Sequence, residues 1–382
     1  GARFRIDPVT ARIIRNRGIE GEAAIDRYLN GTLDDLYDPM LLKDMERAVS
    51  ILCEAVDTGK KIRIVGDYDI DGVCSTYILL QAFERLGSDV DFEIPDRIKD
   101  GYGINESIIE QAHADGVEVI LTCDNGISAF HQVELAKKYG MTVVITDHHE
   151  VPLDGEKEKI PPADAVIDPK QADCPYPFPE ICGAVVAYKL VQVLYARRGV
   201  PQMEWLDLLE FAAIATVGDV MKLQDENRIL VKYGLKKMAQ TKNLGLRRLA
   251  EKNNLDLGAI TAYHIGFVIG PCLNAGGRLK TAKEALALLR AQSEEEAERL
   301  AEELKELNDT RKDMTEQGTE AAKLQVESWY QKDKVLVVFL PECHESLAGI
   351  IAGRLREYYQ KPAIVLTRGE EAVKGSGRSI DE

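Results

Sequence analysis

Short apolar runs alternate with longer amphipathic stretches through the first half of the chain. The apolar runs predict β-strands at 61–65, 90–94, 118–122, 142–145 and 165–167. The stretches between them have helical periodicity and predict helices at 73–86, 105–114 and 128–139. Strands that alternate with helices of this length predict an α/β fold, with a mainly parallel open sheet covered by helices on both faces.

The segments on either side of this sheet have other patterns. Residues 1–46 predict short amphipathic helices, and a proline-rich linker near 175–179 precedes helices at 182–197 and 205–217. Residues 226–330 are mostly helical in pattern and include one long helix, with a face marked by Leu300, Leu304, Leu307, Arg311 and Met314. From 331 a smaller α/β unit begins, with strands at 334–339 and 363–366 around a helix at 347–358.

We therefore expect four parts along the chain. They are an N-terminal helical segment (1–46), the main α/β domain (47–225), a helical connector (226–330) and a second α/β domain (331–382). The sequence stops in the middle of the second predicted sheet, so we expect this last domain to be truncated.

Three aspartates at alternate positions, Asp67, Asp69 and Asp71, directly follow the first predicted strand. Gly66 and Gly72 bracket the loop that carries them. Residues two apart in an extended loop point the same way, so the three carboxylates can converge. Three like charges held together are costly unless a cation neutralises them. The loop is therefore either a metal site or a solvated acidic turn.

Other polar residues follow the ends of the later strands. They are Arg97, Asp124, His148, His149 and Asp168. Because the carboxyl ends of parallel strands meet at one edge, where open α/β sheets bind ligands, we expect these side chains to gather there. A further acid, Asp219, leaves the apolar run at 214–220, although an aspartate at a helix end is also commonplace.

The donor types indicate which metals such a site would hold. Carboxylates and imidazoles without a nearby thiolate suit Mn²⁺ or Mg²⁺, and the imidazoles favour Mn²⁺. The acids are numerous enough for two ions, and ions about 3.5–4 Å apart stabilise both the attacking and the leaving oxygen of a phosphoryl displacement. Adjacent histidines on a loop point apart, so one can bind metal while the other faces substrate.

Two glycine-rich stretches offer groups that bind anions. Residues 273–278 predict a turn that carries Arg278. Residues 375–379 place backbone N–H groups, two hydroxyls and the Arg378 guanidinium together, which suits a phosphate. A flexible hairpin is the alternative interpretation of the second stretch.

Composition narrows the class of protein. The net charge of −16 removes long-range attraction to nucleic-acid phosphates, so binding would depend on a local basic groove and bound metal. No apolar run approaches the ~20 residues of a membrane span. The seven cysteines are scattered singly, which favours reduced thiols in a cytoplasm over a zinc cluster or a disulfide framework.

Taken together, these motifs resemble those of a known family. Residues 67–72, 124–126, 147–149 and 217–219 resemble, in order, the four motifs of the DHH phosphoesterase superfamily. Residues 375–379 resemble the glycine-rich motif of its DHH-associated domain. Within the superfamily the chain most resembles the RecJ family of single-strand-specific 5′-to-3′ DNA exonucleases, through residues 33–45, 94–103 and 270–279.

This resemblance implies roles for individual residues. The metal-binding positions are Asp67, Asp69, Asp71, Asp124, His148 and Asp219. The catalytic positions are His149, which faces the scissile phosphate, with Asp69 and Asp124. The positions that bind substrate and phosphate are Arg97, Tyr102, Arg278, His344, Ser376, Gly377 and Arg378. The chain departs from the pattern at Val65, where many members carry a histidine, and the OB-fold of RecJ proteins is outside this sequence.

The resemblance also implies a function. It is a 5′-to-3′ exonuclease that releases 5′-mononucleotides from single-stranded DNA with two Mn²⁺ or Mg²⁺ ions, in repair and recombination. A single-strand-binding protein or a helicase would be a further partner, and no membrane is involved. One alternative is the same chemistry on short oligonucleotides or cyclic dinucleotides. The other is a non-catalytic scaffold like the Cdc45 relatives, which predicts broken acid motifs, whereas all four motifs here are intact.

Overall fold

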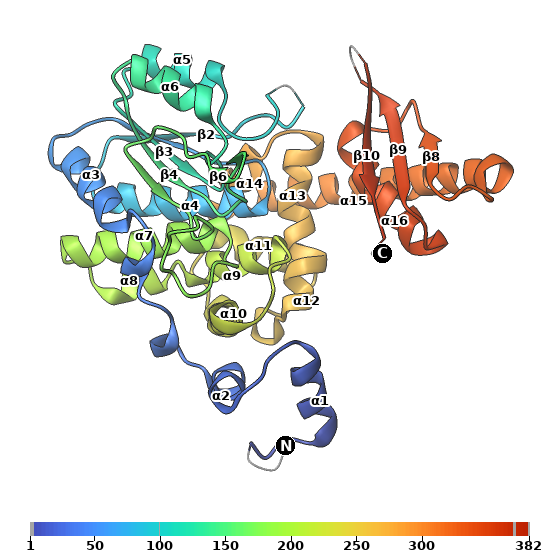
Figure 1. Cartoon of the computed structure of the whole chain (residues 1–382), viewed down its shortest axis with the longest axis horizontal. Helices are drawn as coiled ribbons and strands as arrows, with labels where there is room; N and C mark the ends of the chain where they lie inside the picture. Colours follow the sequence, from blue (N-terminus) through green and yellow to red (C-terminus); the bar gives the residue numbers. More distant parts are fainter. Residues whose placement is uncertain (1–3, 99, 370–371, 381–382) are drawn as a thin grey trace.

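The computed structural model describes residues 4–98, 100–369 and 372–380. Its larger unit contains a parallel five-stranded sheet in the order β2-β1-β3-β4-β7 (Figure 1). The strands are β1 (Ile62–Val65), β2 (Val90–Glu93), β3 (Val119–Cys123), β4 (Thr142–Thr146) and β7 (Ala165–Ile167). Each begins and ends within one residue of a strand predicted from the apolar runs, and the predicted fold class is confirmed.

Helices cover both faces of this sheet. One face packs against α3 (Met45–Asp57), α4 (Ile70–Arg85) and α7 (Gly183–Arg198), and the opposite face against α5 (Glu106–Ala114) and α6 (Phe130–Lys138). Successive strand residues point to opposite faces, so Ile64 lies in the first core and Val65 in the second.

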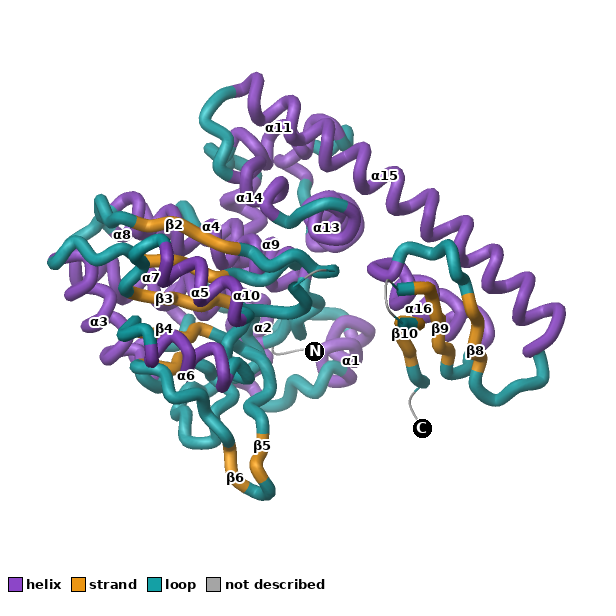
Figure 2. The backbone as a smooth tube through the Cα atoms, turned by 90° about the horizontal axis from the view of Figure 1, so that it is seen from above, coloured by secondary structure: helices purple, strands orange, loops and turns teal. Residues whose placement is uncertain are grey.

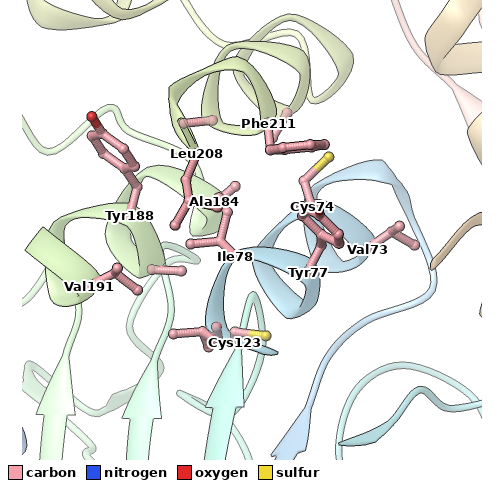
Figure 3. Close-up of a cluster of buried hydrophobic side chains, with 14 of the residues drawn as sticks. Val73, Cys74, Tyr77, Ile78, Cys123, Ala184, Tyr188, Val191, Leu208 and Phe211 are labelled. Atoms are coloured by element: carbon pink, nitrogen blue, oxygen red, sulfur yellow. The ribbon is translucent and has the colours of Figure 1, made fainter. Parts of the chain in front are cut away.

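The larger core continues into a further helix layer. α9 (Leu209–Gly218), which follows the short α8 (Gln202–Leu206), packs across α4 and α7. Figure 3 shows Tyr77 and Ile78 of α4 against Ala184 of α7 and Phe211 of α9. The Tyr77 and Phe211 ring centroids are 4.3 Å apart. Because α9 is anchored in this way, its C-terminal end is fixed relative to the start of α4.

The direction in which the chain winds changes between β1 and β3. From β1 the chain crosses through α4 to the edge strand β2, returns through α5 to β3, and then proceeds through α6 to β4 and on to β7. The loops after β1 and β3 therefore diverge to opposite faces and leave a crevice at the carboxyl edge of the sheet. This is the position at which the predicted site residues follow their strands.

Short elements precede and interrupt this unit. Before the sheet lie α1 (Pro8–Asn16), α2 (Glu22–Asn30) and two 3₁₀ turns at Leu33–Asp35 and Pro39–Leu41. Between β4 and β7 lies a small hairpin of β5 (Leu153–Asp154) and β6 (Lys157–Glu158). The predicted helical character of the N-terminal residues is confirmed for the part that the structure describes.

The connector is helical, as predicted. It contains α10 (Asp225–Met238), α11 (Leu244–Lys252), α12 (Ala262–His264), a π-helical segment at Ile265–Ile269, α13 (Gly270–Leu279) and α14 (Lys283–Leu289). The long α15 (Glu294–Gln325) then runs to the smaller unit (Figure 2). Within the described residues, no helix has the length and apolar character needed to cross a membrane.

The smaller unit is a three-stranded sheet in the order β10-β9-β8. β8 (Leu336–Phe339) and β9 (Ala363–Arg368) are parallel, and β10 (Val373–Arg378) is antiparallel to β9. One face packs on α16 (Ala348–Tyr359) and on the end of α15, around Leu336, Val365 and Ile351.

The first glycine-rich stretch differs from its predicted conformation, and the second excludes its alternative interpretation as a flexible hairpin. Residues 273–278 lie in α13, so the predicted turn is wrong. Gly277 serves close packing instead, because a Cβ there would lie 2.3 Å from the carbonyl oxygen of Tyr68. Residues 375–378 lie in β10 and pair with β9 from Gly375↔Leu366 to Arg378↔Ala363. That stretch is an edge strand rather than a flexible loop.

Candidate functional site

The loop after β1 turns tightly into α4 and carries its aspartates at the crevice. The Asp69 carboxylate caps the helix, because its Oδ1 accepts hydrogen bonds from the backbone N–H groups of Asp71 (2.9 Å) and Gly72 (3.1 Å). Residue 72 must be glycine, since a Cβ there would lie 2.3 Å from the carbonyl oxygen of Asp67. This turn places the Asp67 and Asp69 carboxylates beside that of Asp124.

Asp71 is held by the N-terminus of α7. Its Oδ2 accepts a hydrogen bond from the Gly183 N–H at 2.6 Å, and its Oδ1 accepts one from the Ala184 N–H at 2.7 Å. The first N–H groups of a helix have no partner within the helix, and the helix dipole favours negative charge there. Gly183 also lets Asp124 approach, because a Cβ at 183 would lie 2.8 Å from the Asp124 Cβ. One helix end therefore positions two of the aspartates.

His148 lies among three carboxylates. Its Nε2 is 3.0 Å from Asp124 Oδ1, 3.3 Å from Asp71 Oδ2 and 3.9 Å from Asp219 Oδ2. Asp219 follows the last residue of α9, so the anchored helix brings a fourth segment to the same edge. Asp124 has a left-handed backbone conformation with a φ of 61°, a type of strain that is concentrated at functional sites.

These side chains form three adjoining groups of possible metal ligands. Within each group the ligand atoms lie within 4.8 Å of one another: Asp67, Asp69 and Asp124; Asp71, His148 and Asp219; Asp124, His148 and His149. The structure thus brings together every residue for which the resemblance implied metal binding. The donors are carboxylate oxygens and imidazole nitrogens, so the set fits Mn²⁺ or Mg²⁺, and the shared residues leave room for two neighbouring ions.

Burial and mutual repulsion raise the pKa of the clustered acids. Burial, and then the charge of Asp69, raises the pKa of Asp67 to about 7. Burial and the charge of Asp71 raise the pKa of Asp219 to about 7 and hold that of Asp124 well above its usual range. The ionised cluster is unfavourable by itself, and divalent cations would relieve the repulsion.

His149 contacts Asp147 and Tyr102. Its Nδ1 lies 2.7 Å from Asp147 Oδ1 and 3.0 Å from the Tyr102 hydroxyl, which donates to the Asp124 carbonyl oxygen at 2.9 Å. Burial alone would lower the pKa of His149, but the hydrogen bond with Asp147 and the nearby carboxylates raise it to about 9. The imidazole is therefore protonated at neutral pH, and 43% of it is exposed at the crevice.

Two further acids lie at this edge outside the three groups. Asp147 accepts hydrogen bonds from the backbone N–H groups of His148 (2.7 Å) and His149 (3.2 Å). The sequence motif at 147–149 contains Asp147, and its place directly before the two histidines is the signal for this positioning role. Asp168 has a buried Oδ2 with no hydrogen-bond partner among the described residues, and burial raises its pKa to about 7.

A cavity of about 410 Å³ lies between the larger unit and the small sheet. Its lining includes Arg97, Arg278, Ser346, Gly349, Ser376 and Arg378. Among the residues that the structure describes, none of these arginines is ion-paired with a carboxylate. An acid on the same lining, Glu345, is neutralised by Lys374 at 2.9 Å. The cavity therefore carries unbalanced positive charge, and we call it the anion pocket.

Mutual repulsion among arginines marks the anion pocket as a site for negative charge. Burial, and then the charges of Arg97 and Arg311, lowers the pKa of Arg278 to about 10. Arg278 Nη1 donates to a neutral group, the Ser346 carbonyl oxygen, at 3.1 Å. Arg378 Nη1 likewise donates to Ser376 Oγ at 3.1 Å. A bound anion would relieve this repulsion through charge-assisted hydrogen bonds.

Tyr68 joins the anion pocket to the acidic loop. It stands between Asp67 and Asp69 in the chain, and the Arg97 guanidinium carbon lies 4.8 Å from the centre of its ring. Gly277 packs against its carbonyl oxygen and so brings the C-terminal end of α13, with Arg278, to the same place. The positive pocket and the acidic cluster are therefore neighbours.

Three of the predicted substrate- and phosphate-binding residues lie outside the lining of the anion pocket: Tyr102, whose hydroxyl contacts His149, and His344 and Gly377. His344 lines a separate cavity of about 390 Å³ beside α15, and its Nδ1 lies 2.7 Å from Ser346 Oγ. Gly377 lies in β10, where its carbonyl oxygen accepts from Arg378 at 2.7 Å. Sequence reasoning missed Ser346 and Gly349 on the lining, because only the folding of the small unit brings them opposite β10.

Comparison with known proteins agrees with this geometry. Residues 61–216 match the DHH family, N-terminal domain. The single-stranded-DNA-specific exonuclease RecJ of Bacillus subtilis is 38% identical over 379 residues, which cover 99% of this chain and 47% of that protein. A solved structure of exonuclease RecJ bound to manganese is 33% identical with a TM-score of 0.78, over 89% of this chain and 83% of that chain. The chain belongs to the RecJ family of DHH proteins.

The family resemblance inferred from the motifs is thus confirmed. RecJ of Escherichia coli is also similar, at 36% identity over 98% of this chain and 66% of that protein. The chain therefore spans about half the length of the Bacillus subtilis relative and about two thirds of the Escherichia coli one. Its matched part contains the acidic cluster and the anion pocket.

The first prediction separates metal ligands from other acids at the same edge. Asp124→Asn should weaken Mn²⁺ binding by at least about 10-fold. Mutating even a residue that only hydrogen-bonds to a metal ligand typically lowers metal affinity by that much. Asparagine tolerates the left-handed conformation and carries no charge, so the metal-free protein should stay folded. Isothermal titration calorimetry measures the affinity.

The matched control for this prediction is Asp168→Asn. Asp168 is also buried at the sheet edge with a raised pKa, but it is outside the three ligand groups, so its variant should keep wild-type affinity. Protons compete with the ions for acids of pKa about 7, so wild-type affinity should fall as the pH drops from 8 to 6. Undiminished Mn²⁺ binding by Asp124→Asn would contradict the assignment.

The second prediction distinguishes the two histidines. His149→Ala should retain Mn²⁺ binding but lower the hydrolysis rate by about 10²-fold or more. The substitution removes a charged side chain that would stabilise the reacting phosphate. His148→Ala should lose metal affinity, because His148 Nε2 lies among three carboxylates. Calorimetry and single-turnover hydrolysis on both variants measure the two effects. If His149→Ala lost metal affinity and His148→Ala kept it, His149 would be the metal ligand and His148 would face the phosphate.

Proposed function

We propose that the chain is the catalytic core of a metal-dependent exonuclease that removes 5′-mononucleotides from the 5′ end of single-stranded DNA. The observation that carries this proposal is the anion pocket directly beside the acidic cluster. A terminal phosphate held by Arg97, Arg278 and Arg378 would leave the next phosphodiester at the carboxylates. Hydrolysis there releases one nucleotide from the end of the strand.

The residues at the crevice supply the chemistry around that phosphodiester. Bound Mn²⁺ or Mg²⁺ would provide a hydroxide near neutral pH and neutralise charge on the phosphate oxygens. Protonated His149 is placed to donate a hydrogen bond to a phosphate oxygen, and the Asp147 carboxylate holds its ring through Nδ1. The Tyr102 hydroxyl contacts the same ring and limits its orientation. Bound cations would favour the ionised form of the acids whose pKa is raised, including Asp124.

We propose the following roles for the site residues. Metal binding is assigned to Asp67, Asp69, Asp71, Asp124, His148 and Asp219, and phosphate binding to Arg97, Arg278, Ser376 and Arg378. His344 is assigned a positioning role, because it reaches the anion pocket only through Ser346. The division into parts at 46, 225 and 330 also stays a prediction.

Family membership supports the choice of nucleic acid. The relatives are named as single-stranded-DNA-specific exonucleases, and one solved relative is bound to manganese. We extend the substrate, the Mn²⁺ preference and a role in repair and recombination to this chain as part of the proposal. A single-strand-binding protein or a helicase would supply the strand. The free state of all seven cysteines supports a reducing cytoplasm as the place of action.

A second candidate is hydrolysis of short oligonucleotides or cyclic dinucleotides at the same centre. The size of the anion pocket does not distinguish the two substrate classes. A cyclic dinucleotide, however, has no terminal phosphate for the arginines of the anion pocket to bind. Incubating the protein with Mn²⁺ and end-labelled single strands, duplexes, linear dinucleotides and cyclic dinucleotides separates the candidates. We expect degradation of single strands from the 5′ end. Activity confined to dinucleotides would overturn the proposal.

The third prediction concerns recognition of the strand end. A terminal phosphate carries more charge than an internal one, so a 5′-phosphorylated strand should be cut faster than a 5′-hydroxyl strand. Arg378→Ala should remove about 1–3 kcal/mol of this preference, the scale of a hydrogen bond between charged groups. The ratio of kcat/KM for the two strands measures it.

The control for the terminal phosphate is Arg356→Ala. Arg356 belongs to the same small unit but lies on α16 outside the lining of the anion pocket, so this variant should keep the full preference. Few phosphates would be neutralised, so the salt dependence of cleavage should be shallow. Equal cleavage of both strand ends by the wild-type protein would show that the anion pocket does not bind the end.

A further inference from the structure

A second cavity lies apart from the acidic cluster and the anion pocket. Its volume is about 280 Å³, and its lining comes from the second half of α4, the end of α7, α8, the start of α9 and the end of α10. None of the lining residues belongs to the three ligand groups or to the anion pocket. We call it the distal cavity, and its charged and aromatic lining includes Tyr77, Arg85, Glu210, Phe211, Lys237 and Lys242.

Glu210 is a buried carboxyl on this lining with one oxygen that lacks a partner. Only 3% of the residue is exposed. Its Oε1 accepts a hydrogen bond from Thr241 Oγ1 at 2.7 Å, whereas its buried Oε2 has no hydrogen-bond partner among the described residues. Buried polar groups are normally hydrogen-bonded, so an unpaired carboxylate oxygen on a cavity wall indicates a site for a donor. Burial also raises the pKa of Glu210 to about 7, and a bound donor would favour its ionised form.

Aromatic rings lie next to this carboxyl. Phe211 follows Glu210 on α9, and its ring centroid lies 4.3 Å from that of Tyr77 on α4 (Figure 3). Burial, and to a smaller extent the charge of Glu210, raises the pKa of Tyr77 to about 12, so the two side chains are close together. Apolar walls with a few placed polar groups are typical of sites for small molecules, and these walls suit a flat ring with a polar edge.

Positive charge is in excess on the remaining part of the lining. Arg85 forms a two-point pair with the Glu204 carboxylate, which balances its charge. Lys237 and Lys242 share a single carboxylate, that of Asp207. One positive charge is therefore left over, and the Lys242 side chain, which is 84% exposed, presents it to solvent. This side of the distal cavity favours an anionic group.

A 5′-mononucleotide combines the two groups for which the distal cavity is suited. An exocyclic amino group on its base can donate to a carboxylate, as cytosine does to Glu or Asp in specific recognition of bases. Its phosphate can accept charge-assisted hydrogen bonds from lysine. Sites for drug-sized ligands have volumes of about 300–1,000 Å³. The distal cavity is slightly smaller, so it suits the base and the sugar with the phosphate at its solvent side.

We propose that the distal cavity binds a 5′-mononucleotide whose base carries an exocyclic amino group, with the base at Glu210 and the phosphate at Lys242. This inference rests on the proposed function, because such a nucleotide is what that reaction releases. Cytosine, adenine and guanine carry the amino group, whereas thymine has a carbonyl oxygen in the corresponding place. The distal cavity is thus a second place at which product binds, separate from the centre that forms it.

Calorimetry with 2′-deoxycytidine 5′-monophosphate tests the contact with the base. The titrations use the Arg378→Ala protein in EDTA, which removes metal ions and one arginine of the anion pocket. One nucleotide should bind per chain, and thymidine 5′-monophosphate should bind at least about tenfold more weakly. Glu210→Met, added to the same protein, keeps an unbranched side chain and removes the acceptor. It should lower the affinity for deoxycytidine monophosphate by at least about tenfold.

Lys242→Ala in the same protein tests the contact with the phosphate. Because the side chain is exposed, the variant should fold normally. It should weaken binding of deoxycytidine monophosphate by about three- to fivefold, the scale of a screened contact between exposed charges, and leave binding of 2′-deoxycytidine unchanged. The matched control is Lys236→Ala, which removes an exposed lysine of α10 outside the lining. That variant should bind the nucleotide and the nucleoside with unchanged affinity.

Several results would overturn the proposal. Equal affinity for the two nucleotides, or undiminished binding after Glu210→Met, would reject the base contact. An equal effect of Lys242→Ala on nucleotide and nucleoside would reject the phosphate contact, and this comparison decides even where Glu210→Met does not fold. A protein that binds deoxycytidine monophosphate as expected but does not hydrolyse single strands would reject the proposed function and retain the site. Hydrolysis by a protein whose nucleotide binding ignores both variants would do the opposite.

Discussion

The repulsion among buried carboxylates is the constraint on which the rest of this structure depends. Asp67, Asp69, Asp71, Asp124 and Asp219 come from three separate segments and meet at one sheet edge. The N-terminus of α7 stabilises part of this charge through two backbone hydrogen bonds. Burial and mutual repulsion raise the pKa of Asp67, Asp124 and Asp219, so the rest of the negative charge is not neutralised by groups of the described chain. Two divalent cations would supply the missing charge, so the fold stores repulsion that metal binding releases.

Charge of the opposite sign is concentrated next to this cluster. Many basic side chains described here, such as those of Lys252 and Arg248, are paired with acids. Among the described residues, the arginines that line the anion pocket have no carboxylate partner. Burial, together with the charges of neighbouring arginines, lowers the pKa of Arg278. An acidic protein can therefore bind a phosphate by placing a few unpaired cations beside metal ions rather than by net charge.

Much of the site followed from the sequence because strand ends in a parallel sheet obey simple rules. The apolar runs located the strands, and the topology rule placed Asp124 and His148 at one edge. What failed was the local interpretation of glycine, since glycine disfavours helices but here Gly277 lets α13 touch the Tyr68 carbonyl oxygen in the acidic loop. The contact of Asp71 with α7, 112 residues away, had no local signal either. Such partners depend on packing between distant elements, which periodicity does not encode.

The central claim is that the acidic cluster is built to hold two neighbouring cations. Anomalous diffraction at the manganese edge, from crystals grown with Mn²⁺ at pH 8, measures this directly. The account predicts two peaks, one within bonding distance of Asp67, Asp69 and Asp124 and the other within bonding distance of Asp71, His148 and Asp219. A single peak, or manganese bound only at exposed acids elsewhere on the surface, would contradict it.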